Sequence, residues 1–128
     1  MNLQQYFTTQ QGTGIMSTAD SLGRVNTAIY ARPHILEDGT LAMVMRDRLT
    51  HKNLQENPHA AYLFIEASPG HQGVRLYLKK VREDDDPALI QQMTRRTLTA
   101  EDDKAKGPKF VVYFEVVKAL KLIGGEEI

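Results

Sequence analysis

The sequence contains no cysteine, and this absence excludes several kinds of site at once. Without thiols there are no disulfides, no thiolate nucleophile, and no zinc or iron–sulfur centre held by cysteine. The 128 residues carry 16 basic and 16 acidic side chains, which gives a formal net charge of +0. No global field therefore attracts nucleic acid or anionic lipid, so any anion site must be local.

Long apolar runs are also missing from the sequence. No stretch approaches the roughly 18 residues that cross a membrane, and no signal-peptide core follows Met1. We therefore expect no membrane or nucleic-acid partner, and a cytoplasmic protein because no targeting address is present. The length predicts a single domain over residues 1–128, with enough chain to bury a core.

The alternation of apolar and polar residues predicts a mainly β fold. Six strands are expected, at residues 14–19, 24–33, 41–46, 60–67, 74–81 and 110–123, the last with a bend near Lys118. Short helices are expected around Leu3 to Phe7, over residues 50–56, and from Pro87 to about Thr99. Residues 101–108 resemble a polar loop, and residues 124–128 a frayed tail. Because the connections are short, the strands should pair antiparallel and form a barrel.

The segment from Met43 to Pro58 carries the strongest functional signal. An apolar strand runs into a turn that holds cations and a hydroxyl group, and a short helix follows. A helix N-terminus offers unpaired N–H donors and the positive end of a dipole, which together suit a phosphate. The alternative is an ordinary solvated basic turn in which Thr50 caps the helix.

The preceding strands could hold a flat ring beside that turn. Asn26 and Ala28 are small residues on one strand face, and they would let a ligand approach backbone groups that can read its edge. Plain packing against a neighbouring strand is the alternative. The strand that enters the turn carries Met43 and Met45, and methionine suits an aromatic ring face but also fills cores.

Other kinds of site find less support in the residues. His51 stands at a helix start with no carboxylate that the sequence places to orient it as an acid or base. The remaining histidines lie too far apart for metal-ligand spacing. The acidic run before Pro87 is interpreted as a helix start rather than a magnesium site. Gly12-x-Gly14 lacks the following helix of a dinucleotide fingerprint. No catalytic residue and no metal ligand are therefore predicted.

These elements resemble the pyridoxamine 5′-phosphate oxidase-like, FMN-binding split-barrel superfamily. The resemblance extends from about residue 14 to residue 122. Its most specific element is the pattern N-L-x-x-N-P after a basic or hydroxyl turn, which is N-L-Q-E-N-P at residues 53–58. The small size of the chain and its N-T-A strand at residues 26–28 are also similar to the small FMN-binding proteins of that superfamily.

The resemblance implies a six-stranded antiparallel split β-barrel with two or three peripheral short helices. It also implies a homodimer with two FMN sites at the subunit interface. The residues that it carries over to FMN are Asn26, Thr27, Ala28, Val44, Met45, Arg46, Arg48, Leu49, Thr50 and Lys52. The first three would face the isoalloxazine, the next three would line the ring and ribityl chain, and the last four would lie near the phosphate.

The chain also departs from the family pattern. Many members place an Arg-Lys or Ser-Arg-Lys cluster three to five residues before the N-L pair, whereas this chain has Arg48-Leu49-Thr50 there and Lys52 directly before Asn53. The arginine-rich C-terminal signature of pyridoxamine phosphate oxidases is absent, which argues against vitamin B6 oxidation. The expected function is FMN-dependent oxidoreduction or electron transfer with an unknown redox partner or substrate. The alternatives are a barrel that binds haem or the deazaflavin F420, and a cofactor-free interaction domain.

Overall fold

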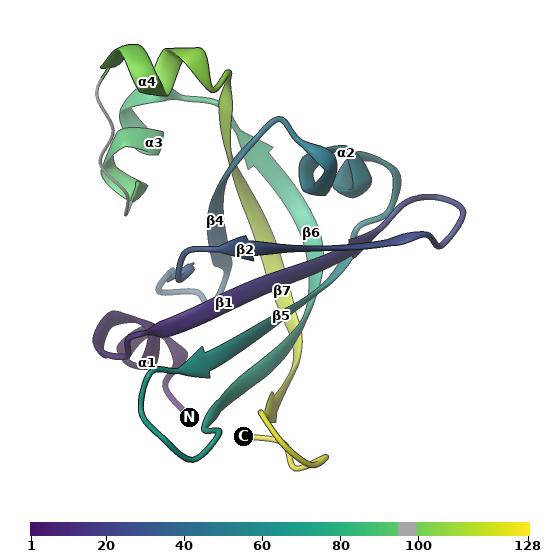
Figure 1. Ribbon diagram of the computed structural model, residues 1–128, viewed down its shortest axis with the longest axis vertical. Helices are drawn as coiled ribbons and strands as arrows, with labels where there is room; N and C mark the ends of the chain where they lie inside the picture. Colours follow the sequence, from purple (N-terminus) through teal and green to yellow (C-terminus); the bar gives the residue numbers. More distant parts are fainter. Residues whose placement is uncertain (95–99) are drawn as a thin grey trace.

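The computed structural model describes residues 1–94 and 100–128 (Figure 1). Its strands are β1 (Gly12–Ala19), β2 (Val25–Tyr30), β3 (His34–Ile35), β4 (Leu41–Arg46), β5 (His59–Glu66), β6 (Gly73–Asp84) and β7 (Lys109–Lys121). Its helices are α1 (Leu3–Thr9), α2 (Leu49–Glu56), α3 (Pro87–Met93) and α4 (Ala100–Ala105). No helix in these two ranges is long and apolar enough to cross a membrane. The chain is mainly β, as the sequence predicts.

The strands form one antiparallel sheet in the order β2-β1-β5-β6-β7-β4-β3. The sheet curls on itself, so that β2, at one edge, lies across from β4, near the other edge (Figure 1). These two strands are not paired, and the barrel is therefore split between them. The predicted split-barrel class is confirmed.

The number of strands is seven rather than the predicted six. The additional strand, β3, has only two residues, which pair with Leu41 and Ala42 at the start of β4. A two-residue strand is too short to show alternation in a sequence. The predicted bend in the last strand is present, because the pairing of β6 with β7 skips Val117 and forms a bulge there.

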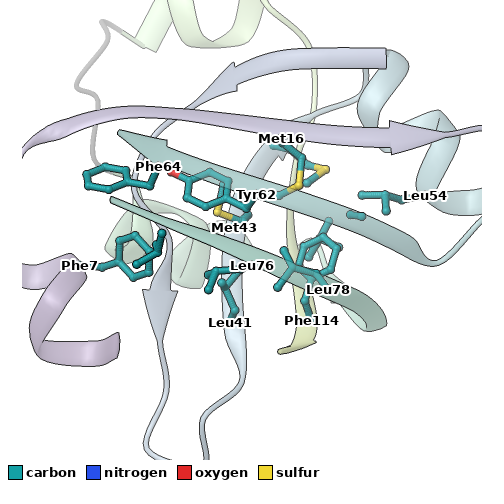
Figure 2. Close-up of a cluster of buried hydrophobic side chains, with 14 residues drawn as sticks. Phe7, Met16, Leu41, Met43, Leu54, Tyr62, Phe64, Leu76, Leu78 and Phe114 are labelled. Atoms are coloured by element: carbon teal, nitrogen blue, oxygen red, sulfur yellow. The ribbon is translucent and has the colours of Figure 1, made fainter. Parts of the chain in front are cut away.

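The inner face of the curled sheet buries the main core (Figure 2). Its largest fully buried side chains include Tyr62, Phe7, Phe64 and Phe114. Phe7, from α1, packs edge-on against Phe64 and Tyr62, with ring centroids 5.4 and 6.1 Å apart. The predicted N-terminal helix is thus present, and the packing of Phe7 against this core holds it in place.

The glycine pair of the first strand has a packing role. A β-carbon at Gly14 would lie 1.9 Å from the hydroxyl oxygen of Tyr62, and one at Gly12 would lie 2.1 Å from the carbonyl oxygen of Ile65. Only glycine lets the backbone approach this closely. Both glycines lie in β1, so the rejection of a dinucleotide fingerprint is consistent with the structure.

Three predictions in the C-terminal third are corrected. The helix that begins at Pro87 ends at Met93, because the backbone becomes extended at the β-branched Thr94; residues 95–99 lie outside the described residues. The expected polar loop instead contains α4, which ends at Ala105, and Gly107 then turns the chain with a φ of 89°. The tail is not frayed, because Ile128 donates its N–H to the Ala119 carbonyl at 3.1 Å and packs against the core.

Candidate functional site

A cleft of about 420 Å³ opens where the barrel is split. Its walls come from the end of β2 and the segment that follows it, from the second half of β4, from the end of α3, and from the start of β7. The residues that line it are Ile29, Tyr30, Ala31, Arg32, His34, Met43, Val44, Met45, Arg46, Arg48, Met93, Thr94, Lys106 and Lys109. The volume lies in the range of about 300–1,000 Å³ that is usual for small-molecule sites.

The open edge of β4 explains why a ligand could bind here. One side of β4 pairs with β7 along its whole length, but on the other side β3 covers only Leu41 and Ala42. Within the described residues, no strand therefore pairs with Met43, Val44 and Met45 on the side of β4 that faces the cleft. Backbone N–H and C=O groups along such an edge need partners, and a ligand ring with polar edges can supply them.

Positive charge gathers at one end of the cleft. Arg46 and Lys109 are direct cross-strand partners, so their side chains leave the same face of the sheet. Arg48 and Lys106 line the same end, and no Asp or Glu belongs to the described lining. Arg46 also donates to the Gly107 carbonyl at 2.9 Å, which ties the connection between α4 and β7 to the cleft. This end is suited to a phosphate or another multivalent anion.

The rest of the cleft is largely apolar and elongated. Methionine, valine, alanine and isoleucine side chains form most of its body. His34 lies at the far end, since it pairs with Ala42, four residues before Arg46 on β4. At about 3.4 Å per residue, this separation is about 14 Å. An elongated ligand with an anionic end and a flat apolar body fits these walls.

A small polar cluster lies behind the wall formed by Tyr30. Thr50 is only 2% exposed, and its hydroxyl accepts from Asn26 Nδ2 at 3.4 Å and hydrogen-bonds with the Tyr30 phenol. Burial raises the pKa of Tyr30, although Thr50 and the charge of Arg48 act in the opposite direction. Tyr30 is thus a neutral phenol that can donate a hydrogen bond to a ligand.

The alternative interpretation, in which Thr50 caps a solvated turn, is wrong about the cap. The cap position of α2 is Arg48, which makes no side-chain capping bond, and Thr50 lies inside the helix. Its hydroxyl is used by Asn26 and Tyr30 instead. The helix N-terminus therefore has a buried polar contact with β2, which sequence patterns do not reveal.

His51 has partners that the sequence interpretation missed. It is 6% exposed, its Nδ1 lies 2.9 Å from Asp47 Oδ1, and its Nε2 lies 2.8 Å from Glu83 Oε2. Its ring stacks on Phe110 with centroids 4.1 Å apart and planes 9° apart. The expectation that no carboxylate orients this histidine is wrong. The spacing of Asp47 and His51, four residues apart at a helix start, was a usable signal.

Glu83 is the fixed member of this cluster. Burial would raise its pKa, but hydrogen bonds from Lys80, His51 and Gln55 outweigh burial and lower the pKa of Glu83 to about 2. The Lys80 ammonium lies 2.5 Å and the Gln55 amide 2.8 Å from the Glu83 carboxylate. Glu83 is therefore ionised over the whole ordinary pH range.

The predicted FMN residues fall into three groups in the structure. Val44, Met45, Arg46 and Arg48 line the cleft. Asn26 and Thr50 lie behind Tyr30, and Ala28 shares their half-buried face of β2. Thr27 lies on the opposite, exposed face of β2, whereas the exposed Leu49 and Lys52 are outside the described lining. The roles given to all ten stay predictions.

Several lining residues were not predicted from the sequence. The polar ones with the largest expected effect on an anion or a hydrogen-bonding ligand are Tyr30, Arg32, Lys106 and Lys109. The run K-A-K-G-P-K at residues 104–109 was a visible concentration of charge, but only the pairing of β7 with β4 brings it to the cleft. Within the described part of the chain, no three His, Asp or Glu side chains are arranged to hold a metal ion.

Comparisons with solved structures identify proteins of the same fold. An FMN-binding protein from Syntrophomonas wolfei subsp. wolfei is 18% identical with a TM-score of 0.76, over 95% of this chain and 84% of that one. A putative pyridoxamine 5′-phosphate oxidase from Lactobacillus delbrueckii is 13% identical with a TM-score of 0.66, over 94% and 92%. HutZ, the heme storage protein from Vibrio cholerae, is 15% identical with a TM-score of 0.65, over 94% and 94%.

These likenesses span nearly the whole chain at low identity. They show that it has the split-barrel fold of the FMN-binding and pyridoxamine 5′-phosphate oxidase-like proteins, as the sequence resemblance implied. No protein-family model and no curated protein sequence matches the chain. Because one fold can host many functions, the residues of the cleft decide which ligand binds.

Proposed function

We propose that the cleft binds FMN and that the protein is a flavin-dependent oxidoreductase or electron-transfer protein. The observation that carries this proposal is the combination of a cationic end with an elongated apolar body beside an open strand edge. FMN has a phosphate at one end and a flat ring system with polar edges at the other. When bound, FMN would supply the electron or hydride transfer, and the protein would supply orientation.

Each part of the cleft has a proposed role toward FMN. Arg46, Arg48, Lys106 and Lys109 would hold the phosphate by charge-assisted hydrogen bonds. The apolar lining of β4 and α3 would cover the ring, and the open edge of β4 would read its polar edge. Tyr30 would donate a hydrogen bond from the opposite wall. Relative to the sequence-based assignment, the phosphate moves from the start of α2 toward the pair formed by β4 and β7.

We further propose that the protein acts as a homodimer. Val25 and Ile29 of β2 are 80% and 76% exposed on its outer face. Ile29 pairs with Ile15 on β1, and Ile15 pairs with Leu63 on β5, so a row of apolar side chains crosses three strands. Exposed apolar surface of this kind is typical of an interface, and its edge at Ile29 also lines the cleft. A Val25→Glu variant should shift the protein toward monomer in light scattering, whereas an unchanged mass would exclude this face.

The test of FMN binding is direct. Purified protein should show flavin absorbance, or the colourless protein should quench FMN fluorescence on titration. The absence of quenching at micromolar FMN would refute the proposal. Titration with F420 in parallel distinguishes the deazaflavin, which the sequence leaves as an alternative.

Haem is the second candidate, because one histidine lines the cleft. His34 belongs to the lining, and its Nε2 donates to the Met93 carbonyl at 2.7 Å. Axial ligation through that nitrogen would require this bond to break. A Soret band that appears on haem titration and is lost in a His34→Ala variant would favour haem. FMN quenching without a Soret band would favour the flavin.

A further inference from the structure

The cluster around His51 is not used by the proposed cofactor site, yet it lies directly behind it. His51, on α2, contacts groups from three directions. These groups are Asp47 before the helix, Glu83 on β6 with its partners Lys80 and Gln55, and the Phe110 ring on β7. The side chain of His51 is 8% exposed. Buried ionisable groups with several charged partners are common at functional sites.

The chemistry of the two contacts defines the charge of the ring. Both nitrogens of His51 face carboxylate oxygens, at 2.9 Å for Asp47 and 2.8 Å for Glu83. An ionised carboxylate only accepts hydrogen bonds, and a neutral imidazole has only one N–H. Both contacts are therefore satisfied only when His51 is an imidazolium. In the neutral ring, a nitrogen lone pair would face a carboxylate oxygen.

The two carboxylates would not respond equally to loss of the proton. Glu83 is held by Lys80 and Gln55 as well, and its side chain is 24% exposed. Asp47 is 57% exposed, and His51 is the side-chain partner of its carboxylate. His51 Nε2 lies 3.2 Å from the Gln55 amide nitrogen as well, but the ionised Glu83 carboxylate is closer, at 2.8 Å, and holds the proton on Nε2. Asp47 can exchange its contact for water, so it is the contact that would open.

Both ends of the cluster connect to the cationic end of the cleft. Asp47 lies between Arg46 and Arg48, which both line the cleft, and the Arg48 N–H donates to the Arg46 carbonyl at 2.9 Å across this tight turn. Phe110 follows Lys109, which also lines the cleft. The His51 ring therefore joins the two segments that carry three of the four cations at that end.

We infer that His51, as an imidazolium shared by Asp47 and Glu83, is a positioning residue that holds these cations together, and that loss of its proton weakens anion binding in the cleft. The inference rests on the proposed function for the identity of the anion, the FMN phosphate. It adds a residue that does not touch the ligand and a dependence on pH. The effect arises because the Arg46–Arg48 turn loses its tether to β6 and β7.

The experiment compares FMN affinity across about pH 5.5 to about pH 9, the range in which histidines titrate, in four proteins. The wild type should lose on the order of tenfold in affinity at the alkaline end, the effect of one charge-assisted hydrogen bond. His51→Gln should bind weakly at every pH, because glutamine cannot bridge both carboxylates. Asp47→Asn should keep its affinity at alkaline pH, because the amide can donate to the neutral ring. His59→Gln, which removes an exposed histidine, should behave as the wild type.

A ligand-free measurement separates this inference from the proposed function. In NMR spectra of the protein without FMN, the amide signals of Arg48 and Lys109 should titrate with the midpoint of the His51 ring protons. If FMN does not bind but these amides follow His51, the proposed function fails and the coupling stands. Amides that do not follow His51 would overturn the inference. The inference would also be overturned if the FMN affinity of Asp47→Asn fell at alkaline pH as much as that of the wild type.

Discussion

Replacing Arg48 by glutamine tests which cations of the chain hold the anion. Arg48 lines the cationic end of the cleft, and its side chain makes no capping bond to α2. The change therefore removes one positive charge from the cleft without removing a helix cap. Lys52→Gln is the matched control, because Lys52 is exposed on the same helix, carries the same charge, and is outside the described lining.

The magnitude follows from the contact that is lost. A hydrogen bond to a charged group contributes about 1.5–3 kcal/mol. Arg48 is exposed, so solvent screens its interaction and the lower end of this range applies. About 1.5 kcal/mol corresponds to roughly a tenfold increase in the Kd for FMN. Lys52→Gln should change the Kd by less than about twofold, because an exposed charge outside the site acts only through a screened field.

Fluorescence quenching of FMN, at low and at high salt, measures the Kd for FMN of each variant and of the wild type. The Arg48→Gln protein should also show a weaker dependence of affinity on salt, because one charge contact is missing. Thermal unfolding of the three proteins should give equal midpoints, which checks that the fold is intact. If Arg48→Gln and Lys52→Gln bind FMN equally, the assignment of the phosphate to this end of the cleft is refuted.

Three further predictions concern the stability of the fold. Glu83 has a folded-state pKa of about 2 against an ordinary value of 4.5, so it stabilises the fold above about pH 4.5, and this contribution is lost as the pH falls toward 2. Urea unfolding should therefore show that Glu83→Gln is less stable than the wild type near neutral pH and that the difference narrows in acid; a constant difference would contradict this. Gly14→Val should lower the unfolding free energy by about 1–3 kcal/mol or prevent folding, because its β-carbon would lie 1.9 Å from the Tyr62 hydroxyl, whereas Gly125→Ala, which meets nothing within 4 Å, should leave thermal unfolding unchanged. Thr50→Val should cost about 1–2 kcal/mol in urea unfolding, since Asn26 and Tyr30 both lose a buried partner, and an unchanged midpoint would show that these bonds contribute nothing net.

Local patterns in the sequence determined most of the secondary structure. Alternation located the long strands, and the acidic run before Pro87 marked the start of α3, where Asp86 accepts from the Ala88 N–H at 3.2 Å. These features are recorded in neighbouring residues, so a single sequence reveals them. The two-residue β3 and the end of α3 at Met93 were missed, because short or weakly patterned segments depend on tertiary partners.

The residues of the cleft also fall into those that the sequence predicted and those that only the tertiary structure revealed. Val44, Met45, Arg46 and Arg48 were found because they are consecutive or nearly so at the end of one strand. Lys106 and Lys109 lie about sixty residues later in the chain, and only the pairing of β7 with β4 brings them to the same end of the cleft. Thr27 was included although it points away, because carrying over a run of adjacent residues ignores the alternation of a strand.

The sequence by itself determined that this chain is an antiparallel β protein, without thiol chemistry, with several cationic residues around the end of one strand. Tertiary structure decided where the sheet stays open, which cations meet there, and that His51 lies between Asp47 and Glu83. The physical reason is that propensity and alternation act between near neighbours. A split in a barrel and a buried charge cluster are formed by segments that meet only when the sheet curls.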